Sequence, residues 1–288
     1  MARHEIHLLA HGRRVRLHRL ADGGDPVVFC HAAPGAGNFD PDPQESAAHG
    51  ITLLAPDRPG YGASDPLQDD WATPGAAADD IAEILKRLGI RSVAAAGWSG
   101  GDRVALALAA RHPDLVSRVV VFSTPAPEEE VPWIPQEHKA GIEALRGLPP
   151  DTVHARLSDM LALIRPEDPH APDALAPLGA TPADTTILAT PGTRERLGNM
   201  LAEAWTLGAM GLAADIAGYT LRPWGFEPGK VDARVMLFYG DADPVAGAAH
   251  GKWWRDSLPH ADLELVPEMG HLLAMPFWGR ALEFLTHK

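Results

Sequence analysis

The sequence predicts an α/β domain built on a mostly parallel β-sheet and interrupted once by a helical insertion. Short β-type runs alternate with helical patterns over residues 5–124, and the same alternation returns after residue 224. The stretch between these two parts is rich in proline and contains helical segments, but no convincing β run. This arrangement favours one sheet domain over two separate domains.

Eight runs predict the strands of that sheet. The first two, EIHLL and RVRLHRL, flank the turn signal His11-Gly12 and predict a hairpin that adds an antiparallel edge. The other six runs are VVFCH, ITLLAPD, SVAAAG, LVSRVVVFS, RVMLFYGD and DLELVP. Helical patterns between them, as in a βαβ unit, predict parallel pairing.

Apolar residues recur with helical spacing in DDIAEILKRLG, which predicts a helix begun by Asp79 or Asp80 and ended by Gly89. A further helix is predicted for PFWGRALEFLTH near the end of the chain.

The predicted division places the core domain at 1–126 and 225–288. The cap, at 127–224, is inserted after the sixth strand and is longer than an ordinary loop.

Charge and composition exclude several classes of protein. The chain has 25 Lys plus Arg against 38 Asp plus Glu, a formal charge of -13, which opposes binding to nucleic acid or anionic lipid. It shows neither a secretory apolar region nor 18 uninterrupted apolar residues, so a cytoplasmic protein is expected. The single cysteine, Cys30, lies in an apolar run and is interpreted as a buried small hydrophobe.

The stretch GWSGG satisfies the pattern G-x-S-x-G around Ser99, between a predicted strand and a predicted helix. In a nucleophile elbow the serine ends a strand and begins a helix, so that its hydroxyl is exposed at the end of the sheet. The alternative, a glycine-rich turn with an idle serine, remains open on this motif alone.

A serine hydroxyl needs a base, normally a histidine that a carboxylate orients. Two late strands end near such groups. GDADP supplies Asp241 and Asp243, of which Asp243 is favoured because Asp241 lies closer to the strand and is suited to an Asx turn. His271 follows the last strand and is expected to open the final helix.

Acyl transfer also requires donors for the developing oxyanion. The backbone amide of Gly100 is one candidate, and the other should come from the loop HAAPGAG after VVFCH. The loop DRPGYGASD is interpreted as structural, with Asp57 and Arg58 fixing it by polar contacts; a substrate-facing Tyr61 is the alternative.

Taken together, HAAPG, DRPGYGASD, GWSGG, GDADP and MGH resemble the α/β-hydrolase superfamily, in its branch of smaller cap-bearing enzymes, and they occur in the family's order. The resemblance implies an eight-stranded sheet flanked by helices, with a cap after strand six. It also implies a triad of Ser99, Asp243 and His271, with oxyanion amides from Ala33 and Gly100.

Two departures from the family pattern affect the oxyanion donors. Ala32 stands where the family usually has glycine, which leaves open whether Ala32 or Ala33 supplies the second amide. Gly100 stands where a large residue is common, which leaves space beside the nucleophile.

The expected function is hydrolysis of an ester, lactone or related acyl bond of a small, largely apolar substrate, without metal or cofactor. Alternatives are a proline iminopeptidase-like enzyme that uses Glu128, Glu129 and Glu130 for a substrate ammonium, a C–C bond hydrolase and a haloperoxidase-like enzyme. A ligand-binding receptor on the same fold is the non-enzyme alternative.

Apolar lid residues predict an apolar pocket roof. The residues expected to bind substrate are His31, Ala32, Trp98, Trp133, Met160 and Trp205. The partner is a small molecule, with no nucleic acid or membrane, and a homodimer is left open.

Overall fold

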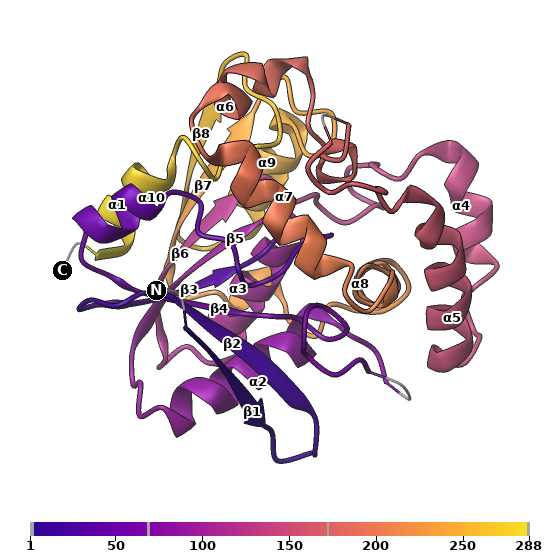
Figure 1. Cartoon of the computed structure of the whole chain (residues 1–288), viewed down its shortest axis with the longest axis horizontal. Helices are drawn as coiled ribbons and strands as arrows, with labels where there is room; N and C mark the ends of the chain where they lie inside the picture. The colour runs from indigo at the N-terminus through magenta and orange to yellow at the C-terminus, as the bar shows by residue number, and fades with distance from the viewer. Residues whose placement is uncertain (1–2, 68–69, 172, 287–288) are drawn as a thin grey trace.

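The central element of the fold is one eight-stranded sheet (Figure 1). The computed structural model describes residues 3–67, 70–171 and 173–286. The strands are β1 Arg3–Leu8, β2 Arg14–Ala21, β3 Pro26–Cys30, β4 Thr52–Pro56, β5 Val93–Trp98, β6 Val116–Phe122, β7 Arg234–Gly240 and β8 Ala261–Val266. Their spatial order is β1-β2-β4-β3-β5-β6-β7-β8.

The pairing confirms the mostly parallel sheet with an antiparallel edge. β1 pairs with β2, and β2 with β4, in antiparallel register. From β4 to β8 all neighbouring strands are parallel. After β3 the chain crosses to β4 on one side, and β5 then lies on the other side of β3. In open α/β sheets the carboxyl ends of the strands form a ligand crevice at such a switch point.

Side chains alternate along each strand, so the two faces of the sheet have separate cores. Val27 and Phe29 of β3 pack in the core that α10 also contributes to, whereas Val28 and Cys30 pack in the core that includes α2 and α3. The helices of the core domain are α1 Pro43–Ala48, α2 Pro74–Arg87, α3 Gly100–Arg111, α9 Ala248–Ser257 and α10 Trp278–Thr286. Cys30 is a free, buried thiol, as expected.

The start of α2 corrects the prediction from the sequence. The helix begins at Pro74, and Thr73 caps it because the Thr73 hydroxyl accepts a hydrogen bond from the amide of Ala76 at 3.2 Å. Asp79 and Asp80 lie inside the helix, where they pair with arginine side chains of other elements. Residues that can cap a helix occur both at Thr73 and at Asp79 and Asp80. The helix starts after Thr73, where Pro74 occupies the first helical position.

The cap lies between β6 and β7, and the described residues there contain no strand. Its α-helices are α4 Gln136–Glu143, α5 Pro150–Leu161, α6 Thr185–Ala189, α7 Thr193–Ala204 and α8 Met210–Thr220. Short 3₁₀ turns are η1 Ala162–Ile164, η2 Ala176–Leu178, η3 Pro182–Asp184 and, after the cap helices, η4 Pro228–Lys230. In Figure 1, α4 and α5 lie at the right of the view, far from α1 and α10. In the described part of the chain, no helix is long and apolar enough to cross a bilayer.

A buried polar junction fastens the cap to the core. The Arg58 guanidinium donates to the carboxylate of Asp215 on α8, with a shortest distance of 2.7 Å, and the Tyr61 hydroxyl donates to the same carboxylate at 2.8 Å. Arg58 also donates to the carbonyl oxygens of His31 and Ala32, in the loop that follows β3. Both charged side chains are almost fully buried. One side chain therefore joins a core loop, the loop after β3 and the cap.

The loop DRPGYGASD is thus structural, as predicted. The Asp57 carboxylate accepts hydrogen bonds from the Arg16 side chain and from the amide of Gly37, both at 2.6 Å. Tyr61 is buried against α8 and does not face a substrate cavity in the described residues.

Replacing Asp215 by alanine should destabilise the protein by about 3–5 kcal/mol, because it leaves the Arg58 charge buried without a partner. Urea unfolding measures this change. The matched control is Asp79→Ala, which removes the exposed pair with Arg111 and should cost less than about 1 kcal/mol. Equal losses in the two variants would contradict the role of the buried junction.

Candidate active site

Ser99 lies in a strained turn between β5 and α3, with φ 55° and ψ -118°. Left-handed backbone of this kind is costly for a serine and persists only where its surroundings enforce it. A Cβ on Gly97 would lie 2.5 Å from the Asp102 backbone, and one on Gly101 would lie 2.0 Å from the Cys30 carbonyl oxygen. Both positions therefore require glycine, and the tight turn carries half-buried Ser99 at the carboxyl end of β5.

Two further contacts hold this turn on β6. The Ser99 amide donates to the Phe122 carbonyl at 2.9 Å, and the Phe122 amide donates to the Asp102 carboxyl at 2.9 Å. The second carboxyl oxygen of Asp102 has no hydrogen-bond partner among the described residues. Burial raises the pKa of the Asp102 carboxyl well above its ordinary value, which favours its neutral form.

Asp243 and His271 form a buried pair. The His271 Nδ1 lies 2.7 Å from Asp243 Oδ2, and Asp243 Oδ1 accepts hydrogen bonds from the amides of Val245 and Ala246. Burial by itself raises the pKa of the Asp243 carboxyl, but the facing His271 ring and the two amides hold that pKa below its ordinary value. An ionised carboxylate therefore faces the Nδ1 edge of the imidazole.

Several contacts place the His271 loop beside the elbow. The indole N–H of Trp98, the residue before Ser99, donates to the His271 carbonyl at 3.0 Å. From the cap, the Asp184 carboxylate accepts a hydrogen bond from the Leu272 amide at 3.1 Å. Gly179 of the cap packs against the imidazole so closely that a Cβ there would lie 3.1 Å from His271 Cδ2. Core and cap together fix the position of the ring.

Asp241, the other candidate acid, has a different contact. It is exposed, and its carboxylate accepts a hydrogen bond from the Glu268 amide at 2.7 Å, which ties the loops after β7 and β8 together. The expected Asx turn is made by Asp243, through the Val245 amide, and not by Asp241. His271 lies in the loop before α10 and does not open that helix, which begins at Trp278.

The loop after β3 brings Ala33 against Gly100. A Cβ on Gly100 would lie 3.0 Å from Ala33 Cβ and 3.7 Å from the Ala33 amide nitrogen. The backbone amides of Ala33 and Gly100 donate to no protein acceptor in the described ranges. The same Cβ would lie 3.3 Å from the ring of Tyr219, on α8 of the cap. Tyr219 thus fills the space that the absent side chain of Gly100 leaves beside the nucleophile.

Residues 25–276 match the family model described as alpha/beta hydrolase fold. The chain belongs to this family. The pimeloyl-[acyl-carrier protein] methyl ester esterase of Chromobacterium violaceum is 28% identical over 263 residues, which cover 91% of this chain and 92% of that protein. The 2-hydroxy-6-oxononadienedioate/2-hydroxy-6-oxononatrienedioate hydrolase 1 of Dechloromonas aromatica is 26% identical, and the match covers 92% of this chain and 88% of that protein.

Solved structures of the α/β-hydrolase fold are similar over nearly the whole chain. The bromoperoxidase from Bacillus anthracis superposes with a TM-score of 0.72 at 17% identity, covering 98% of this chain and 99% of that one. At this identity the similarity shows the fold alone.

The residues predicted to bind substrate are only partly brought together in this α/β hydrolase. His31 is fully buried with both ring nitrogens in use: Nδ1 donates to the Ala32 carbonyl and Nε2 accepts from the Arg58 amide. Burial, reinforced by the Arg58 charge, lowers the pKa of His31 well below its ordinary value, so the ring is neutral. His31 therefore acts as a brace for the loop, and its assignment to the substrate pocket is wrong.

The other predicted pocket residues have different positions. Trp98 is fully buried, as is nearly all of Trp205, and Ala32 lies in the braced loop. Met160 is 56% exposed on the outward face of α5, and it does not line the cavity between α3 and the cap helices. Only Trp133 of the set lines that cavity.

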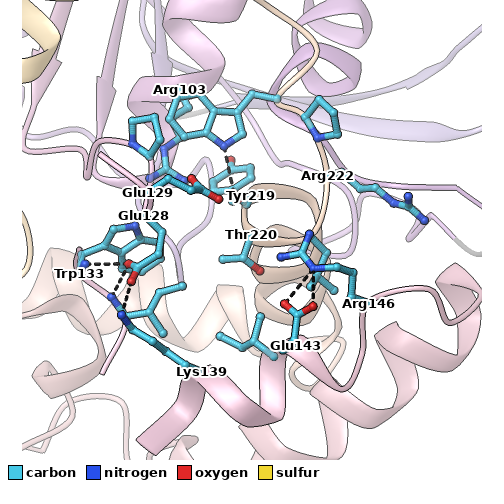
Figure 2. A pocket seen from close by; sticks show the side chains of 16 residues that line it. Arg103, Glu128, Glu129, Trp133, Lys139, Glu143, Arg146, Tyr219, Thr220 and Arg222 are labelled. Carbon is cyan, nitrogen blue, oxygen red and sulfur yellow. Dashed lines mark hydrogen bonds and ion pairs between the residues drawn. The ribbon is translucent and has the colours of Figure 1, made fainter. Parts of the chain in front are cut away.

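A cavity of about 500 Å³ opens between α3 and the cap helices (Figure 2). Its lining combines apolar and aromatic side chains with charged ones. The Glu128 carboxylate pairs with Lys139 at 2.7 Å, and Glu143 pairs with Arg146 at 2.9 Å. Other apolar residues of the cap pack in the core, as Met200 does, or face solvent, as Leu163 does.

Sequence reasoning missed four functional candidates: Arg103, Asp184, Asp215 and Tyr219. A signal for two of them was present. Arg103 interrupts the apolar helix DRVALALAA, and Asp215 interrupts the apolar stretch GLAADIAG. A charge within an otherwise buried face requires a partner or a function.

Replacing Asp102 by asparagine should stabilise the protein increasingly as the pH rises. The unfolded aspartate has a pKa of about 3.9, and burial raises the pKa of the native carboxyl above it, so unfolding of the wild type releases a proton and its stability falls with rising pH. Asparagine keeps the oxygen that accepts from the Phe122 amide and removes this proton release. Urea unfolding at pH 4.5 and pH 7.5 should show the difference between variant and wild type grow by at least about 1 kcal/mol. An unchanged difference would argue that Asp102 is ionised in the native protein.

Proposed function

We propose that this α/β hydrolase is a serine hydrolase that cleaves a carboxylic ester or a related acyl bond of a small molecule. The observation that carries the proposal is the buried 2.7 Å contact between Asp243 and His271, held beside the strained turn that carries Ser99. A nucleophile, a base and an acid that orients the base are the groups that acyl transfer needs.

In the proposed mechanism, His271 Nε2 removes the Ser99 proton as the hydroxyl attacks the substrate carbonyl. The proton on Nδ1 is held by Asp243, which fixes the tautomer and stabilises the imidazolium that forms. His271 then protonates the leaving alcohol, and water hydrolyses the acyl-enzyme by the reverse sequence. Each step moves one proton between the attacking or leaving oxygen and the imidazole.

The amides of Gly100 and Ala33 are the proposed donors to the oxyanion. Their closeness supports Ala33. Arg58 binds the Ala32 carbonyl oxygen, which belongs to the same peptide unit as the Ala33 N–H and so helps to orient that donor. Hydrogen bonds from Arg58 to His31 hold this loop in place. The donors therefore need little rearrangement as charge develops on the substrate oxygen, and such preorganisation is the basis of oxyanion stabilisation.

Similarity to the Chromobacterium violaceum methyl ester esterase supports an ester as the substrate class. The Dechloromonas aromatica relative favours a second candidate, hydrolysis of a C–C bond by the same three residues. The peptidase alternative loses support because the Glu128 carboxylate already accepts from the amides of Trp133 and Ile134 and pairs with Lys139. A substrate ammonium would have to displace these partners.

Asp243→Asn should lower kcat for p-nitrophenyl butyrate by about 10³–10⁴-fold, because the amide cannot hold the imidazole in the tautomer that accepts the serine proton. Steady-state kinetics measures this. The matched control, Asp241→Asn, changes an exposed residue two positions away and should alter kcat less than threefold. The reverse ranking would transfer the acid role to Asp241.

The same assay with a vinylogous diketone distinguishes the two candidate reactions. Turnover of the ester by the wild type supports the esterase proposal. Turnover of the diketone alone would assign the C–C hydrolase activity, and turnover of neither substrate class would overturn the proposal of an acyl hydrolase.

A further inference from the structure

Arg103 is a buried cation without an anionic partner. It is 2% exposed, and in the described part of the chain no carboxylate forms an ion pair with it. Its Nη2 donates to the Pro125 carbonyl at 2.8 Å, whereas its Nε–H has no hydrogen-bond partner. Buried arginine N–H groups are normally all satisfied, so the vacant donor calls for an explanation.

The neighbours of Arg103 are aromatic rings. Its guanidinium carbon lies 4.5 Å from the ring centre of Trp224, 5.3 Å from that of Tyr219 and 5.7 Å from that of Trp133. Rings offset part of the cost of burying the charge, but they accept no hydrogen bond in the plane of the guanidinium. Asp102, although next in sequence, lies on a different side of α3, where its carboxyl accepts a hydrogen bond from the Phe122 amide.

Tyr219 is a second unpartnered donor at the same place. Its hydroxyl is buried and has no hydrogen-bond partner in the described ranges. Burial raises the pKa of this phenol, which therefore keeps its proton and remains a donor at neutral pH. Arg103 and Tyr219 both line the 500 Å³ cavity, and Figure 2 shows them together at one end of it.

Four other charged residues of the cavity are paired with one another. Figure 2 shows the Glu128–Lys139 and Glu143–Arg146 pairs at the opposite end of the view from Arg103. Arg103 thus differs from the other cations of the lining in being enclosed and free of a carboxylate. Glu129 also lines the cavity and is exposed, and its negative charge disfavours a dianion there more strongly than a monoanion.

Two residues that line this cavity extend toward the elbow, although Ser99 itself is not among the lining residues. Arg103 follows Ser99 by four residues, about one turn of α3, and side chains on a helix lean toward its N-terminus. Tyr219 reaches from the same cavity to within contact distance of Gly100. A molecule whose reacting carbonyl lies at Ser99 can therefore place another group at Arg103.

We propose that Arg103 and Tyr219 form a subsite for a carboxylate on the substrate, so that the preferred substrate is a half ester of a dicarboxylic acid. This inference rests on the proposed function for its ester group. One guanidinium and one phenol match one carboxylate: the Arg103 Nε–H and the Tyr219 O–H supply donors, and one positive charge balances one negative charge. A phosphate dianion would exceed that balance.

The test compares two ligands that differ only in the carboxylate. Monomethyl adipate carries it, and dimethyl adipate replaces it by a second methyl ester. Binding to Ser99→Ala, measured by calorimetry, removes turnover from the measurement. Monomethyl adipate should bind at least tenfold more tightly than dimethyl adipate, and adding Arg103→Gln should abolish this preference. Adding Arg146→Gln instead, which removes a cation already paired in the same cavity, should keep the preference.

Equal binding of the two ligands to Ser99→Ala, or a preference that survives Arg103→Gln, would overturn the subsite. If Arg103→Gln fails to fold, Arg103→Lys and Tyr219→Phe carry the test, and each should weaken the preference about threefold or more. An unchanged preference in both would overturn the proposal. If wild-type protein hydrolyses no ester while the Arg103-dependent preference persists, the proposed function fails and the subsite stands.

Discussion

The buried Arg58 guanidinium is the contact on which most of this molecule's arrangement depends. It binds Asp215 on α8 and the carbonyl oxygens of the two residues that precede Ala33. One side chain therefore sets the positions of both the cap and the loop after β3. Because a buried charge without its partner is costly, the loop and the cap hold their relative positions before any substrate binds. Preorganised donors of this kind are what acyl transfer requires.

The sheet and the positions of the candidate triad could be predicted from the sequence because local rules determine them. Each parallel strand is a short apolar run, and Ser99 stands in a pattern that only glycines can flank without collision. Asp243 and His271 follow late strands, so parallel pairing alone brings them to the same edge of the sheet. The start of α2 was predicted too late in the chain, because Asp79 and Asp80 could also cap a helix. Thr73 followed by Pro74 is the stronger start signal.

The cavity between α3 and the cap could not be predicted, because it depends on contacts between residues far apart in the chain. Tyr219 occupies the space beside Gly100 only once α8 packs over the elbow. Likewise, His31 was assigned to the pocket from its position in the loop. In the structure its Nε2 accepts a hydrogen bond from the Arg58 amide, so His31 supports the loop. Many apolar residues of the cap pack its helices together, whereas the cavity is lined by both charged and apolar side chains, including Arg103.

The central claim is that Ser99 is the nucleophile of this α/β hydrolase. The most direct measurement is covalent labelling with a fluorophosphonate, followed by mass spectrometry of the peptides. The account predicts one adduct per chain, on Ser99, with no label on Ser99→Ala and slow labelling when Asp243 is replaced by asparagine. A folded protein that remains unlabelled, or that carries the label on another serine, would contradict it.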